Sequence, residues 1–131
     1  MTDCSNLLLR KDYLTPCINF LNNGFNAIAN NPNPIGTSVK IIKKKVKEYL
    51  ASVGAWYYMP VSNGMGRAGC PDILVCYKGN FVAFEVKAPG KLKNTTANQD
   101  REINGINKAG GVAIVVDDVK QVMEVIDDYN I

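Results

Sequence analysis

The stretch 72–87 constrains the fold of this chain more than any other feature. Two runs rich in β-branched and aromatic residues, 72–77 and 81–86, are separated by a Lys-Gly-Asn segment at 78–80. A short glycine-containing segment between two such runs is typical of a β-hairpin, because glycine adopts the positive φ that tight turns require. The sequence therefore predicts two antiparallel strands joined by a two-residue turn.

The register of this hairpin decides which charged side chains meet. A turn at 78–79 places Asp72 directly opposite Glu85, with Cβ atoms about 4.5–5.5 Å apart. Lys87 lies two residues beyond Glu85 and points to the same face. A turn at 79–80 places Asp72 opposite Lys87 instead, with Glu85 on the diagonal, so both registers gather the three residues. A one-residue change in the turn would move Asp72 to the other face.

Two carboxylates that face each other repel unless a cation lies between them. Mg²⁺ prefers one or two carboxylates together with water and phosphate oxygens, and it lowers the pKa of a bound water. We therefore expect Asp72 and Glu85 to bind a divalent metal and Lys87 to orient or deprotonate the water. A Glu-x-Lys pair alone is typical of a solvated strand face, but the Pro-Asp in register with it favours metal-dependent cleavage of phosphodiester bonds.

The composition of the chain excludes several other kinds of catalytic and metal-binding site. The 131-residue chain contains no histidine, which excludes Ser-His and Cys-His catalytic centres. Its four cysteines lack C-x-x-C spacing, so we expect free thiols in a reducing cytoplasm rather than a zinc site. No run of 18 apolar residues and no signal-peptide layout is present, so we expect no membrane span and a cytoplasmic location.

The remaining chain predicts an α/β domain at 37–131, after an asparagine-rich extension at 1–36 that has no assigned role. Apolar spacing and breakers predict helices at 37–53, 97–109 and 119–129, and strands at 55–59 and 112–116 in addition to the hairpin. The order αβββαβα fits a mixed central sheet with helices on both faces. The unbroken apolar run at 112–116 indicates a strand buried on both faces, and a short helix is expected from Pro16 in the extension.

The segment 39–127, about two thirds of the chain, resembles the VRR-NUC family of PD-(D/E)xK nucleases, and is similar to small stand-alone members found in bacteriophages. The resemblance lies in Gly-Cys-Pro-Asp at 69–72, Phe-Glu-Val-Lys-Ala-Pro-Gly at 84–90, a glutamine that opens a helix, and Gly-Gly before the last strand. It implies a restriction-endonuclease-like fold, Mg²⁺ or Mn²⁺ without a small-molecule cofactor, and endonucleolytic cleavage of branched or duplex DNA. It also implies a homodimer that cuts opposed strands as junction resolvases do.

The resemblance carries roles over to individual residues. It implies that Asp72 and Glu85 bind the metal, that Lys87 is the catalytic lysine, and that Gln99 contacts water or phosphate beside them. An alternative for Gln99 is a helix-capping or merely exposed amide. The basic residues that we expect to contact DNA, against the alternative of a solvated helix face for the first two, are Lys43, Lys44, Arg67, Lys91 and Lys93.

One position departs from the family pattern. Many members carry a glutamate near the start of the first helix, where this chain has Val39. Glu48 follows about 2.5 turns later, roughly 13 Å along the axis, which is too far to substitute. The chain cuts with two carboxylates and a backbone carbonyl, or it is a weak or inactive nuclease-fold protein that binds DNA or a partner, or Asp12 of the extension reaches the site. A further alternative is that residues 1–36 bind a host factor.

Overall fold

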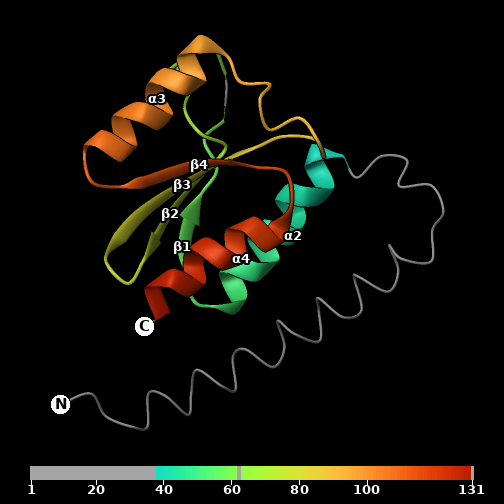
Figure 1. Cartoon of the computed structure of the whole chain (residues 1–131), viewed down its shortest axis with the longest axis vertical. Helices are drawn as coiled ribbons and strands as arrows, with labels where there is room; N and C mark the ends of the chain where they lie inside the picture. Colours follow the sequence, from blue (N-terminus) through green and yellow to red (C-terminus); the bar gives the residue numbers. More distant parts are fainter. Residues whose placement is uncertain (1–37, 62, 131) are drawn as a thin grey trace, which may run out of the picture.

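The computed structural model describes residues 38–61 and 63–130, and its elements follow the predicted order (Figure 1). Ser38 begins the first helix, Gly54 follows its end, and Thr96 and Asp118 cap the two later helices through their side chains. The elements are α2 (Val39–Ser52), β1 (Trp56–Tyr58), β2 (Ile73–Tyr77), β3 (Asn80–Val86), α3 (Ala97–Lys108), β4 (Val112–Val116), α4 (Val119–Asp127) and a 3₁₀ turn η1 (Asp128–Asn130).

The four strands form one mixed sheet in the order β1-β2-β3-β4. The first three are antiparallel, and β4 runs parallel to β3 through the crossover helix α3. Tyr77 pairs with Asn80, so the hairpin turn is Lys78-Gly79, the first of the two predicted registers. Both turn residues have positive φ, 48° and 78°, which is the backbone of a type I′ turn.

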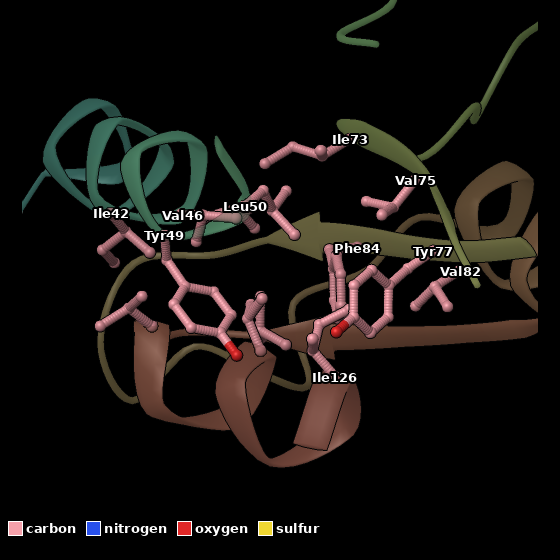
Figure 2. Packing of buried hydrophobic residues seen from close by; sticks show 14 residues of the cluster. Ile42, Val46, Tyr49, Leu50, Ile73, Val75, Tyr77, Val82, Phe84 and Ile126 are labelled. Atoms are coloured by element: carbon pink, nitrogen blue, oxygen red, sulfur yellow. The ribbon is translucent and has the colours of Figure 1, made fainter. Parts of the chain in front are cut away.

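The hydrophobic core lies between the sheet and the helices α2 and α4. Ile42, Val46 and Leu50 recur at helical spacing on α2 and are almost fully buried. Figure 2 shows these three side chains against those of the sheet, where Phe84 is also fully buried. Ile126 of α4 packs into the same cluster. Alternate residues of β2 and β3 point into this core, which leaves the intervening residues on the other face.

Helix α3 lies on that other face, opposite α2 and α4 (Figure 1). Asn107 on α3 bonds both the amide and the carbonyl of Ala113 on β4, at 2.7 and 3.0 Å. The β1 side of the face is open, since Trp56 and Tyr58 remain 65% and 51% exposed. The face that carries Glu85 is therefore covered at one edge and accessible at the other.

Strand β4 is an edge strand, because no strand lies beyond it among the described residues, and its residues are buried or half-buried on both faces, with Ala113 and Val116 buried on opposite sides. Two sequence expectations need correction. Asp72 directly precedes β2 instead of opening it, and the last helix ends at Asp127, where the chain tightens into η1. The expected helix from Pro16 and the boundary at residue 36 lie outside the described residues. No described helix has the length and apolar character needed to cross a membrane.

Candidate active site

The hairpin register gathers the predicted acidic residues at one end of the sheet. With Ile73 paired to Phe84, the next position outward places Asp72 opposite Glu85. Asp72 Oδ2 accepts a hydrogen bond of 2.9 Å from the backbone amide of Val86, which fixes its carboxylate against β3. The conformation of the turn at one end of the hairpin thus determines which residues face each other at the other end. Asp72 and Glu85 lie at that other end, five residue pairs from the turn.

Glu85 sits in a network with Lys87 and Gln99. The carboxylate is 3% exposed, and its Oε1 accepts hydrogen bonds from the Gln99 amide and from Lys87 Nζ, the latter at 3.2 Å. Gln99 Oε1 in turn accepts from Lys87 Nζ at 3.0 Å and from the Thr96 amide at 2.9 Å. Gln99 therefore caps α3, as one of the two alternatives expected, and also bonds the two charged groups, while its contact with water or phosphate stays a prediction.

The electrostatic environment of Asp72 and Glu85 favours the binding of a cation. Burial raises the pKa of Glu85, and the neighbouring Asp72 charge raises it further, while the hydrogen bond and positive charge of Lys87 lower it. A carboxylate whose charged form is disfavoured in this way gains when a divalent ion neutralises it. The described residues contain no cluster of three or more His, Cys, Asp or Glu. Asp72 and Glu85 would hold Mg²⁺ or Mn²⁺ with water and phosphate oxygens as the other ligands.

A fourth charged residue enters the site from α2. Lys43 Nζ donates a 2.7 Å hydrogen bond to Asp72 Oδ1, with both side chains about a quarter exposed. Lys43 stands one helical turn after Val39, so it occupies the same side of the helix. Val39 itself is half-buried against the core. Glu48 pairs with Lys44 at 3.9 Å on the helix surface and brings no carboxylate to the site.

A glycine-rich loop before β2 forms one wall of the site. Together with Glu85 and Gln99, residues 60–61, 64 and 66–72 line a pocket of about 410 Å³. Gly69 has a φ of 80°, and a Cβ there would lie 2.3 Å from the Asn98 backbone carbon, so the loop touches the first turn of α3. Only glycine permits this approach.

Arg67 fixes the same loop to α3. Its guanidinium donates a 2.5 Å hydrogen bond to Glu102, a buried acid that Arg101 also contacts. The hydrogen bond from Arg67 lowers the pKa of Glu102, and the same bond raises the pKa of Arg67. Sequence reasoning missed Glu102. The only available signal was an acid on the first half of a helix that follows an arginine-containing loop.

The other basic residues are distributed more widely. Lys44 projects from α2, 74% exposed, toward Glu48. Lys91 and Lys93 are exposed and line a shallow hollow in the loop between Lys87 and α3. Of the five predicted DNA contacts, Lys43 lies at the carboxylates and Arg67 at the pocket wall, while the other three are exposed on the surface.

Comparison with known proteins finds similarity among solved structures. No protein-family model matches the chain, and no curated protein matches it. Among solved structures, a chain described as "VRR_NUC domain" is similar, with a TM-score of 0.56 and 32% sequence identity. The match covers 72% of this chain and 99% of the solved chain. The similarity therefore extends over the whole of that domain in both fold and sequence.

Proposed function

Because the chain belongs to the VRR-NUC family, we propose that it is a metal-dependent endonuclease that hydrolyses phosphodiester bonds in DNA. The family supports a nuclease role in DNA processing, and the opposed carboxylates support the metal dependence. The single observation that carries the proposal is the pairing of Asp72 with Glu85 beside Lys87 and Gln99. When bound there, Mg²⁺ or Mn²⁺ polarises a phosphate and activates water.

Each residue has a distinct part in this reaction. Asp72 and Glu85 hold the metal, and the Val86 amide keeps Asp72 in place. Lys87 lies within hydrogen-bonding distance of Glu85 and Gln99, so its ammonium is directed at the same space. There it orients the attacking water and stabilises negative charge that develops on the phosphate. Gln99 positions the side chains of Glu85 and Lys87.

We also propose the finer points of substrate and assembly. Branched or otherwise structured DNA is the substrate, and a homodimer is the active form, since cutting opposed strands requires two sites. The exposed Lys91 and Lys93 would contact phosphates beside the cut, and such contacts make DNA affinity dependent on salt concentration. The cytoplasm is the proposed location, in keeping with free thiols at Cys70 and Cys76.

A second candidate function is a nuclease-fold protein that binds DNA or a partner and cuts weakly. It is favoured by one observation: the described part of α2 brings Lys43, and no carboxylate, to Asp72. In this alternative the site holds its metal too weakly to sustain turnover.

Cleavage of labelled DNA separates the two functions. Four-way junction, flap and linear duplex are incubated with Mn²⁺, Mg²⁺ or EDTA, with Asp72→Asn and Glu85→Gln as matched neutral variants. We expect metal-dependent products from the wild type, fastest on a branched substrate, and a loss of at least about 10³-fold in rate in either variant. A gel shift of the same DNA without products would establish the binding protein instead, and wild-type rates in Asp72→Asn would refute the assignment of the site.

A further inference from the structure

The ion pair between Lys43 and Asp72 has a consequence for metal binding. We propose that Lys43 is a positioning residue that occupies Asp72 in the metal-free protein, competes with the divalent ion for this carboxylate, and so sets the metal affinity of the site. The inference rests on the proposed function, because it takes Asp72 and Glu85 as the metal-binding pair.

The two oxygens of Asp72 are held in different ways. Oδ2 accepts from the Val86 backbone amide at 2.9 Å, and this donor belongs to a strand paired on both sides. Oδ1 accepts from Lys43 Nζ at 2.7 Å, and this donor is the end of a flexible four-carbon side chain. A metal that approaches Asp72 can displace the ammonium far more easily than the strand, so Oδ1 is the oxygen for which the two cations compete.

The charges around the two carboxylates also indicate that Lys43 weakens metal binding. Lys43 contacts Asp72 and Lys87 contacts Glu85, so each carboxylate already has an ammonium partner. The charge of Lys43 also acts on Glu85. An arriving divalent ion therefore meets a neutralised pair of carboxylates rather than two free negative charges, which weakens its binding.

After a metal displaces it from Asp72, Lys43 can pair with a phosphate group of the substrate. A phosphate group brought to the metal by the substrate is the nearest negative charge that the proposed reaction supplies. Transfer of Lys43 from Asp72 to this phosphate favours metal binding when DNA is present and disfavours it when DNA is absent. Lys43 thus couples metal and substrate binding through one side chain.

The test is calorimetric titration of Mn²⁺ alone into wild type, Lys43→Gln and Lys44→Gln, without DNA. Lys44→Gln is the matched control: it removes the same charge from the neighbouring position of α2, but Lys44 contacts Glu48 instead of Asp72. We expect Lys43→Gln to lower the Mn²⁺ dissociation constant about tenfold, the usual size of a partly exposed charge-assisted hydrogen bond. Lys44→Gln should stay within about twofold of the wild type.

The melting temperature provides a second test, which stays informative if a variant is destabilised. In EDTA, Lys43→Gln should melt below the wild type, and saturating Mn²⁺ should raise its melting temperature more than that of Lys44→Gln. Lys43→Met, which keeps the length of the side chain, should behave as Lys43→Gln does. Mn²⁺ affinity in Lys43→Gln and Lys43→Met that is no higher than in Lys44→Gln, or no binding to any of them, would overturn the inference.

The outcome also separates this inference from the proposed function. If the wild type cleaves DNA with Mn²⁺ but the two lysine variants bind metal equally, the inference fails alone. If Lys43→Gln gains Mn²⁺ affinity while the wild type leaves every DNA substrate intact, the inference stands and the proposed endonuclease function fails.

Discussion

At the scale of single residues, the chemistry of the site comes from the surroundings of Glu85. This acid is buried against the sheet, faces another carboxylate, and receives hydrogen bonds from Lys87 and Gln99. Burial and the Asp72 charge outweigh the effect of Lys87, so the pKa of Glu85 is raised. Under the proposed function, stability and metal binding therefore make opposite demands on this side chain, because neutral Glu85 favours the fold and charged Glu85 would favour the metal.

The first prediction concerns Glu85→Gln in the absence of metal. A raised pKa means that the folded state binds the Glu85 proton more tightly than the unfolded state does, so stability is lost as pH rises through the unfolded pKa toward the folded one. At pH 7 the variant should be more stable than the wild type by about 1 kcal/mol, or roughly 3–5 °C in melting temperature. Below about pH 4 the two should coincide, because Glu85 is then neutral in both states.

Thermal melts in EDTA between pH 3.5 and 8 test this prediction, with Glu48→Gln as the control for an acid on the helix surface. A difference between Glu85→Gln and the wild type that is constant over the whole range would contradict it.

The second prediction concerns Lys87→Ala. Because the proposed role of Lys87 is to act on water and phosphate rather than as a metal ligand, the substitution should reduce the single-turnover cleavage rate by about 10²–10³-fold at saturating Mn²⁺. The Mn²⁺ dissociation constant should not rise, since the loss of a nearby positive charge makes binding of the cation tighter. Rapid-quench kinetics and calorimetry measure the two quantities. A large loss of metal affinity with an unchanged rate would make Lys87 a structural residue.

At the scale of elements, the loop before β2 and the first turn of α3 form one unit. Gly69 lies against the Asn98 backbone, and Arg67 pairs with Glu102 on the next turn of the helix. Gln99 stands between these two contacts and reaches Glu85. The loop therefore positions α3, and α3 presents the Gln99 side chain that bonds Glu85 and Lys87.

The third prediction compares Gly69→Ala with Gly64→Ala. Both glycines have φ near 80°, so both alanines strain the backbone, but only the Cβ at position 69 meets other atoms, those of the α3 backbone. Gly69→Ala should therefore be the less stable variant by about 2 kcal/mol or more, and should lose most of its cleavage activity as Gln99 moves away from Glu85. Melting curves and cleavage rates of the pair are the measurement. Equal effects at the two positions would mean that the loop does not brace the helix.

At the scale of the whole molecule, one face of the sheet provides stability and the other provides the site. The core cluster of described residues lies entirely within 42–126, between the sheet and the helices α2 and α4. The opposite face is only partly covered, and the pocket that Asp72 and Glu85 line lies on this face. A sheet with one closed face and one open face suits an enzyme that must admit a large polymer.

The fourth prediction is that residues 38–131 form an independent domain. Since the described residues form a hydrophobic core of their own, deletion of 1–37 should keep a single cooperative melt within about 5 °C of the full chain. Mn²⁺-dependent cleavage of linear duplex should persist. Calorimetry and the cleavage assay on both chains provide the comparison. Loss of cleavage with an intact fold would indicate that the extension supplies part of the site, as the Asp12 alternative requires.

The sequence by itself determined the order of the elements and the position of the hairpin. Periodicity indicated the helices and strands, and the turn segment at 78–80 limited the hairpin to two registers, both of which gather Asp72, Glu85 and Lys87. The structure adopts the register that pairs Asp72 with Glu85. These features are local, because a strand alternates every two residues and a turn type depends on its own φ angles. The position of Gln99 at the start of a helix was also predictable, and so was the lack of a carboxylate at Val39.

Only the tertiary structure decided how distant segments meet in the site. The Lys43–Asp72 pair joins residues 29 positions apart, and the Arg67–Glu102 pair joins residues 35 apart. Gly69 meets Asn98 in the same way. No periodic pattern links such positions, because their approach depends on how α2 and α3 pack on the sheet. The sequence thus specified the two carboxylates, and packing specified the lysine that contacts one of them.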